Sequence, residues 1–389
     1  MTTTVTRAGV AAVARQELRL RLRAGRWKLL LLAWLVLLGL FTVLTTLAAG
    51  SQPGLEDDGV LVFGALVLFV LGLALLVVPS LAAQSVNGDR ERGTLASLQV
   101  TRLTAWEITL GKFLAAWGTA VLFLLLTAPY VLVTVVQGGV GLGRVVVVTL
   151  VLALLLGTVC AVSLMLSALL ARTTTSGVLS YLAVGALTIG TLIAFGLGTY
   201  VTAEDVVERY PVVDCATSEG FDELYGGLSG EPVPARPDGS YAPEDLPDGC
   251  SQRTESFATT RTRTDRVWWL LAPNPFVVVA DAAPSLGPVP EGLGERERRA
   301  AAQARDLDVL GQLGDGVREA RQGPVGSGGP ATAVFVPSSE LEEPAVEDPG
   351  AVWPYGLAFD VLLATGALTV TARRLRTPSR TLPRGQRVA

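Results

Sequence analysis

Six long apolar runs alternate with polar stretches along the chain, and each run is long enough to cross a lipid bilayer. A transmembrane helix needs about 20 apolar residues to span a hydrocarbon core of about 30 Å. The runs cover residues 27–49, 60–82, 113–136, 145–170, 177–200 and 351–372. Pro79 and Pro129 fall inside runs, where neighbouring helices can satisfy the carbonyl groups that proline frees. The pattern predicts an all-α polytopic membrane protein with six transmembrane helices, five of them within residues 27–200.

The segment ahead of the first run has an amphipathic pattern of its own. Arginines recur at helical spacing from Arg15 to Arg26, beside a stripe that includes Leu18 and Leu22. We expect residues 1–26 to form a cytoplasmic amphipathic helix in the headgroup plane, with a simple positive anchor for the first span as the alternative. A cleavable signal peptide is not expected, because the apolar run is too long and no small-residue cleavage site follows it.

Charge is segregated although the net charge is only −4. Outside residues 200–350, all but one of the Lys and Arg residues lie in the first 28 residues, the 83–112 loop, Arg172 and the tail 373–389. Cytoplasmic loops carry an excess of Lys and Arg, so both termini and the 83–112 loop are expected in the cytoplasm. The strong preference for Arg over Lys is typical of a high-GC bacterium. We therefore expect a multi-pass protein of a bacterial plasma membrane.

Residues 201–350 are expected to form an extracytoplasmic domain between the fifth and sixth spans. They hold 27 of the 35 acidic residues, together with Cys215 and Cys250. An oxidising compartment permits a disulfide between these two cysteines, and two free thiols are the alternative. The apolar stretch 267–280 is short for a crossing and carries two prolines, which predicts a re-entrant or interfacial segment. Residues 295–321 have helical spacing, whereas 226–250 and 323–350 are rich in turn-forming residues.

Missing motifs exclude several kinds of chemistry. The chain has no G-x-x-x-x-G-K-[ST] phosphate loop, so it does not hydrolyse ATP by that route. It has no histidine, which excludes histidine metal sites, histidine-based triads and histidine proton relays. We expect no catalytic residues, no metal site and no enzymatic activity in this chain alone. Nothing in the sequence indicates a nucleic-acid partner.

The polar loop at residues 87–112 carries the most specific pattern. It resembles the first cytoplasmic loop of ABC-2-type permeases, the membrane subunits of ATP-binding-cassette exporters. The matching residues are Glu91, Gly93, Thr94, Leu95, Leu98, Thr101, Glu107, Gly111 and Lys112. The loop departs from the family pattern at Ala96, where an acid is usual, and at Arg102, where proline is usual. The Pro273-Asn274-Pro275-Phe276 run and the arginine cluster after the last span are similar to actinobacterial members.

The resemblance implies a permease that couples ATP hydrolysis by a separate ATP-binding subunit to export of a substrate. It implies pairing with a second copy or a sister permease, within the lipid bilayer. ATP and Mg²⁺ would bind to the partner, and no cofactor would bind to this chain. Physically, Thr94 can cap a short helix, and Leu95 and Leu98 give that helix an apolar edge for a groove on the partner. A surface helix that only joins two spans is the alternative.

Asp360 lies near the middle of the last span, where an ionised carboxylate costs several kcal/mol unless it is paired or faces water. It is a candidate for an intramembrane polar site on a translocation path. The alternative is an acid bonded to Ser163, Ser167 or Thr188 on a neighbouring helix. A different class of function, an ion-coupled secondary transporter, would use Asp360 as its coupling acid. A membrane sensor with an extracytoplasmic ligand-binding domain is a third possibility.

Overall fold

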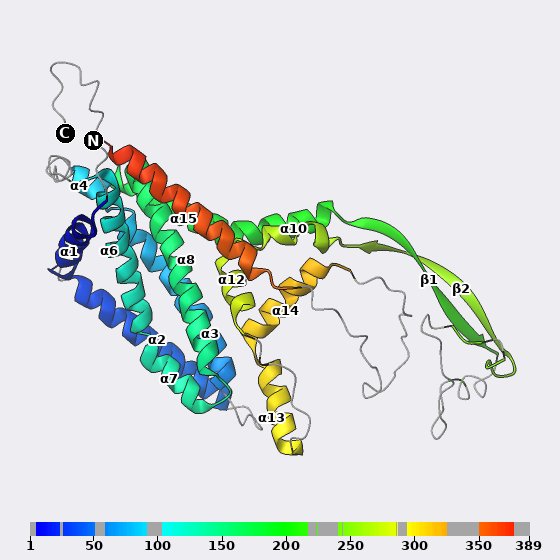
Figure 1. Cartoon of the computed structure of the whole chain (residues 1–389). Coiled ribbons are helices and arrows are strands. Elements are labelled where there is room, and N and C mark those ends of the chain that lie inside the picture. The colour runs from blue at the N-terminus through cyan, green and yellow to red at the C-terminus, as the bar shows by residue number, and fades with distance from the viewer. Residues whose placement is uncertain are drawn as a thin grey trace. The chain divides into compact units, whose positions relative to one another are not determined.

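The chain divides into two compact units in the computed structural model, and each is described by itself. The helical unit comprises Met1–Ala194, Trp269–Arg318 and Ala351–Ala389, and the hairpin unit comprises Phe195–Trp268 and Glu319–Gly350. The structure describes residues 5–23, 26–50, 59–91, 103–216, 224, 240–242, 244–284, 286, 294–324 and 350–376. Figure 1 shows the labelled elements.

Within these residues, six helical segments are long and apolar enough to cross a membrane, which confirms the six predicted spans. The segments are Trp27–Gly50, Gly59–Glu91, Ala105–Gln137, Leu142–Leu169, Thr173–Val201 and Trp353–Leu375. The first lies in α2 (Arg26–Gly50), the second in α3 (Gly59–Ala82) and α4 (Asn87–Glu91), and the fourth and sixth are α8 (Leu142–Leu169) and α15 (Trp353–Leu375). The protein is thus mostly helical and has six helical segments suited to crossing a membrane.

The third and fifth segments are interrupted helices. The third begins as α6 (Ala105–Leu125), eight residues before the predicted start of its span, and continues as α7 (Ala128–Gln137). Pro129 stands in the first turn of α7, a position at which its missing N–H costs nothing. The fifth consists of α9 (Thr173–Gly185), a π-helical turn at Ala186–Gly190 and α10 (Thr191–Val201). The apolar pattern indicated neither interruption.

Helix α8 runs through the middle of the helical unit and packs against α3, α6, α9 and α15. Its buried face, which includes Leu156, meets fully buried residues of α3 such as Leu66 and Leu71. In contrast, α2 and the α9–α10 segment expose large apolar side chains along most of their length. In a bilayer those faces would meet lipid, which is as apolar as leucine.

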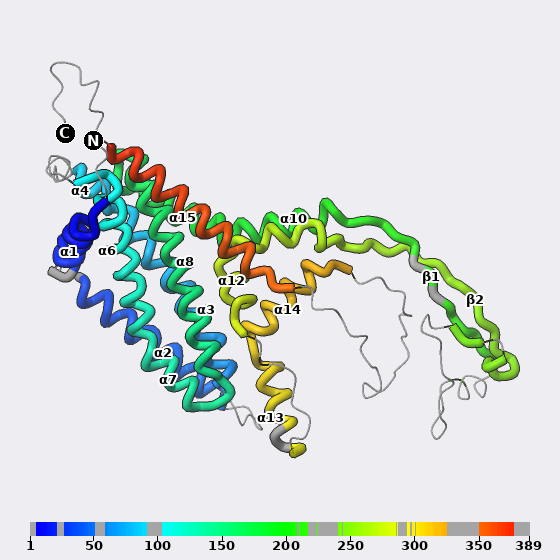
Figure 2. Tube along the Cα trace, viewed as in Figure 1, coloured from blue at the N-terminus to red at the C-terminus, as the bar shows by residue number. Residues whose placement is uncertain are grey.

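Two ends of the helical unit can be distinguished by their contacts. At one end, here called the α4 end, a small cluster joins Val86, Ile108, Leu164, Ala168 and Leu375. The end of α15 therefore lies beside the start of α6, as Figure 2 also shows. At the opposite end, the α7 end, the start of α3 approaches the end of α7 closely.

The segment 267–280 contains a short helix inside the helical unit. Helix α12 (Pro275–Ala282) packs against α8 and α15, and Val278 and Val279 are fully buried. The predicted helix at 295–321 forms as two helices, α13 (Glu295–Asp306) and α14 (Val309–Gln322), which are separated at Leu307 and Asp308. The predicted turn region 226–250 and the lead-in 323–350 lie mostly outside the described residues.

The hairpin unit contains strands that the all-α prediction did not include. Strands β1 (Glu204–Cys215) and β2 (Cys250–Arg261) pair antiparallel, from Glu204 opposite Arg261 to Cys215 opposite Cys250. The last pair forms a disulfide bond. The strands are polar and largely exposed, so they lack the alternation of apolar and polar residues that would have predicted them. Pro211 is tolerated because both strands of a two-stranded sheet are edges.

Candidate functional site

The loop at residues 87–112 is described at its two flanks. Its central residues lie outside the described part of the chain, and these include five of the predicted coupling positions: Gly93, Thr94, Leu95, Leu98 and Thr101. The two departures from the family pattern, Ala96 and Arg102, lie there as well. Glu91 ends α4, and Glu107, Gly111 and Lys112 lie in the first turns of α6. The geometry of the site therefore rests on these four residues.

Lys112 joins three segments through a buried cluster of charges. Its side chain is 1% exposed and forms ion pairs with Glu17 of α1 (Arg7–Arg23) and with Asp89 of α4, the latter at 2.5 Å. Its Nζ also donates to the carbonyl oxygen of Ser85 at 3.0 Å. The cluster ties the two flanks of the loop to each other and to α1.

Glu107 joins the start of α6 to the start of α1. It forms a capping box with Thr104: its backbone N–H donates to Thr104 Oγ1 at 3.2 Å, and its Oε2 accepts from the Thr104 N–H at 2.7 Å. Its Oε1 accepts from the N–H and the hydroxyl of Thr6, at 2.8 and 2.5 Å. One carboxylate thus satisfies donors at the beginnings of two helices that are about one hundred residues apart in sequence.

Two glycines allow α1 to lie directly against α6. A Cβ atom at Gly111 would be 2.5 Å from Cβ of Val13, and a Cβ atom at Gly9 would be 2.6 Å from Glu107 Oε1. Real Cβ atoms do not approach other atoms so closely. Glu107, Gly111 and Lys112 of α6 therefore all serve the docking of α1.

The inner face of α1 also buries an arginine that the helix pattern did not single out. Arg21 donates to the carbonyl oxygen of Leu81 at 3.0 Å and to Thr119 Oγ1 at 3.5 Å. Burial lowers the pKa of Arg21, and the nearby Glu17 opposes this shift. Arg15 and Arg19 stay exposed on the other face. Helix α1 is thus docked on the bundle and keeps an exposed basic face toward its surroundings.

The other flank of the loop rests on the turn between α8 and α9. Glu91 Oε1 accepts from the backbone N–H of Thr173 at 3.3 Å, and Asn87 Nδ2 donates to the carbonyl oxygen of Arg172 at 3.4 Å. Ser167 Oγ accepts from the backbone N–H groups of Val86 and Asn87, at 3.0 and 3.1 Å. A displacement of the loop would therefore reach α1, α3, α6 and the α8–α9 turn together.

Asp360 lies apart from the loop, in the interior of the helical unit. Its residue is 4% exposed and lines a small cavity, and its Oδ2 has no hydrogen-bond partner. Two of the partners suggested from sequence are engaged elsewhere: Ser167 binds the α4 flank, and Thr188 donates to the carbonyl oxygen of Val184 at 2.9 Å. The third, Ser163, is buried. In the described part of the chain, Asp360 therefore forms no hydrogen bond with Ser167 or Thr188.

Two buried carboxylates near the α7 end were not found from the sequence. Asp308 binds Nη2 of Arg144 at 2.5 and 2.7 Å, and both side chains are 4% exposed. Asp281 is 2% exposed, pairs with Arg318 at 2.6 Å and accepts from the backbone N–H groups of Val352 and Trp353 that begin α15. Asp281 therefore fixes the start of the last span.

Comparison of the chain with protein-family models, with curated proteins and with solved structures finds no match.

Proposed function

We propose that this chain is the membrane-spanning permease subunit of an ATP-binding-cassette transporter, acting in export. In this proposal a separate subunit binds ATP and Mg²⁺ and hydrolyses the nucleotide. The chain pairs with a second copy or a sister permease, and substrate passes between the halves. The motif at 87–112, the absence of a phosphate loop from the sequence and the six spans support this assignment together.

The observation that carries the proposal is the buried cluster around Lys112. Asp89 and Lys112 lie on opposite flanks of the loop, and their ion pair closes the loop at its base. Glu17 adds α1 to the same cluster. A loop that only connects two spans would not need a buried clamp, because short connections tolerate flexibility. A loop that receives force does need such an ion pair, because without it the two flanks would move independently and would not pass the displacement on to the spans.

The orientation follows from charge. Among the described residues, the basic side chains of α1, Arg90 and Lys112 of the loop, and Arg373, Arg374 and Arg376 lie toward the α4 end, where α15 also ends. The positive-inside rule then places that end in the cytoplasm of a bacterial plasma membrane. On this reading the hairpin unit and its disulfide lie outside the cytoplasm, in a compartment that permits cysteine oxidation.

A second candidate function is favoured by Asp360, whose buried carboxyl group lacks a partner at Oδ2. An acid of this kind is a common feature of ion-coupled secondary transporters. Such a transporter would move substrate in vesicles without nucleotide or a companion subunit. The permease proposed above would not.

The test uses the loop edge predicted from sequence. The double variant Leu95→Asp/Leu98→Asp is compared with Leu313→Asp, which places an acid on an exposed position of α14. The test requires an ATP-binding subunit encoded in an adjacent reading frame, which its phosphate loop would identify, and this subunit is co-expressed with each variant. We expect the double variant to reach the membrane but to lose co-purification and ATP-driven transport, whereas Leu313→Asp retains both. Unchanged co-purification and transport in the double variant would refute the coupling role.

A further inference from the structure

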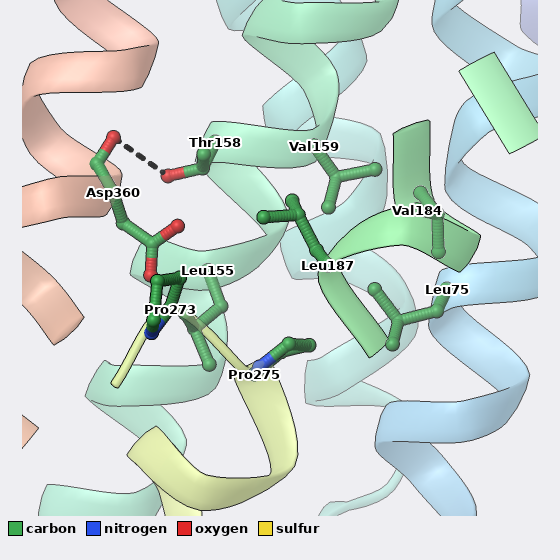
Figure 3. A pocket seen from close by; sticks show the side chains of 9 residues that line it. All are labelled: Leu75, Leu155, Thr158, Val159, Val184, Leu187, Pro273, Pro275 and Asp360. Carbon is green, nitrogen blue, oxygen red and sulfur yellow. Dashed lines mark hydrogen bonds between the residues drawn. The ribbon is translucent and has the colours of Figure 1, made fainter. Parts of the chain in front are cut away.

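Asp360 is a buried titratable group that the proposed function leaves unused. It lies on α15 and lines a cavity with Leu155 and Thr158 of α8, Leu187 of the π-helical turn, and Pro273 and Pro275. The cavity is small, about 10 Å³, close to the space that one water molecule requires. Figure 3 shows the carboxyl group of Asp360 pointing toward Pro273. A carboxyl group in such a place is either neutral or heavily penalised.

The surroundings of the carboxyl group are short of hydrogen-bond donors. Pro273 and Pro275 have no backbone N–H to offer. Thr158, the only other polar side chain among the described lining residues, donates to the backbone carbonyl oxygen of Asp360 at 3.3 Å. The amide of Asn274, between the two prolines, donates to the Thr188 carbonyl oxygen and to Thr191 Oγ1, both at 2.8 Å. An ionised carboxylate would therefore be poorly stabilised here.

No charged residue lines the cavity either, among those the structure describes. In the described part of the chain, no hydrogen bond or ion pair joins Asp360 Oδ2 to the titratable groups on α15 and on the elements packed against it. They are Arg144 and Cys160 on α8, Glu107 and Lys112 on α6 and Asp281 on α12, with Tyr355, Arg373 and Arg374 on α15 itself. Arg144, Glu107, Lys112 and Asp281 have the partners described above. The neutral form of Asp360 is the one that this packing accommodates.

The surroundings of Asp360 contain an irregular helical turn and a direct contact between two backbone segments. The π-helical turn at Ala186–Gly190 interrupts the regular ladder, and Asn274 bonds to the carbonyl oxygen of Thr188 within it. Such turns often occur at functional sites. On the other side, Gly356 lies one turn before Asp360, and a Cβ atom there would be 2.2 Å from the Ala272 carbonyl oxygen. Helix α15 therefore touches the backbone before the two prolines directly.

We propose that Asp360 is a reversible proton-binding site in the interior of the helical unit. The carboxyl group carries a proton in the closed packing seen here. When the Pro-Asn-Pro segment and the π-helical turn move apart, water enters and accepts the proton from the carboxyl oxygen, which leaves a hydrated carboxylate. Because the closed state binds the proton more tightly than the open state, a rise in pH favours opening and a fall in pH favours closure. The proposal does not depend on the permease assignment.

The first experiment measures the proton itself. Infrared spectra of the full chain in lipid nanodiscs are recorded across pH about 5 to 9, and the spectrum of Asp360→Asn is subtracted at each pH. We expect a carbonyl-stretch band of a protonated carboxyl group at the lower pH values that disappears reversibly as pH rises. Asp360→Glu should retain a band that titrates. A difference spectrum with no such band at any pH, or with a band unchanged throughout, would overturn the proposal.

The second experiment measures the opening. Leu187→Cys places a thiol in the cavity wall, and its rate of reaction with a small water-soluble thiosulfonate is followed in the presence of Asp360 and of Asp360→Asn. The unsubstituted chain, whose free Cys160 is buried, supplies the baseline. The rate with Asp360 is divided by the rate with Asp360→Asn, and this ratio cancels the effect of the thiol's own ionisation. We expect this ratio to increase with pH, by at most about tenfold per unit for one linked proton. A ratio that does not change with pH would contradict the linkage.

Discussion

Replacing Lys112 by methionine removes the ammonium at the centre of the loop base and preserves the length of the side chain. The variant removes the ammonium that Glu17 and Asp89 share, because both bind Lys112 Nζ in the native protein. The Ser85 carbonyl oxygen also loses its donor. The substitution thus removes the cation that two largely buried carboxylates share.

The size of the effect follows from burial. Removing one partner of a buried ion pair costs about 3–5 kcal/mol. The side chains of Glu17 and Asp89 are 15% and 11% exposed, so some water reaches them and the lower limit, about 3 kcal/mol, applies. For a domain of this size that loss lowers Tm by about 6–12 °C. The triple variant Lys112→Met/Glu17→Gln/Asp89→Asn removes all three charges and should recover most of the loss, since neutral replacements of buried ion clusters are often tolerated.

Cys160 offers a built-in reporter for this measurement. It is the free cysteine of the described residues and is buried in α8, whereas Cys215 and Cys250 are joined in a disulfide. A dye that becomes fluorescent on reaction with thiols therefore reports unfolding of the helical unit during heating. A Tm for Lys112→Met within about 2 °C of the native value, or a triple variant as unstable as the single one, would refute the role given to the cluster.

Three further predictions concern other contacts. Glu107→Gln weakens the capping box and the bonds to Thr6. We therefore expect faster amide hydrogen exchange throughout α1 and a decrease of about 1 kcal/mol in the free energy of unfolding. Unchanged exchange in α1 would contradict its docking through this carboxylate. Cys250→Ser removes a disulfide that contributes about 4 kcal/mol to stability. Strands β1 and β2 should then lose protection from amide hydrogen exchange, whereas the Tm of the helical unit, reported by labelling of Cys160, should not change. Arg263 donates to Asp265 and lowers the pKa of that carboxyl group. The stabilisation by this pair is fully present at pH values above about 4, the pKa of aspartate in the unfolded chain. It is lost as the pH falls through the lower pKa of Asp265 in the folded state. Amide hydrogen exchange around residues 263–266 should therefore increase only in acid.

The membrane-spanning helices were predictable because their signal is local. An apolar run of sufficient length has few alternatives, and all six runs form helices. The starts of the helices were less accurate, since helices continue beyond the apolar core. Helix α6 begins at Ala105, and the Thr104-to-Glu107 spacing of a capping box is visible in the sequence. That signal could have placed the boundary correctly.

The contacts of the candidate site could not be read from the sequence. Glu17, Asp89 and Lys112 are far apart in the chain, and only the docking of α1 on α6 brings them together. The amphipathic pattern of α1 indicated a surface helix but not which residues it would bury. The hairpin was missed because its strands are polar and lack the alternation of apolar and polar residues, although the disulfide that joins their ends is one of the alternatives that the sequence allows.

The most direct test of the coupling loop is its sidedness and its protection by a partner. Thr94→Cys is compared with Gly143→Cys at the α7 end, where a side chain has open space. Both are treated with a membrane-impermeant maleimide in right-side-out and inverted vesicles, with and without the neighbouring ATP-binding subunit. We expect position 94 to react only in inverted vesicles and to be shielded by the subunit, while position 143 reacts only in right-side-out vesicles and is not shielded. Reaction of position 94 from the outer medium would contradict the proposal that this loop couples the chain to an ATPase.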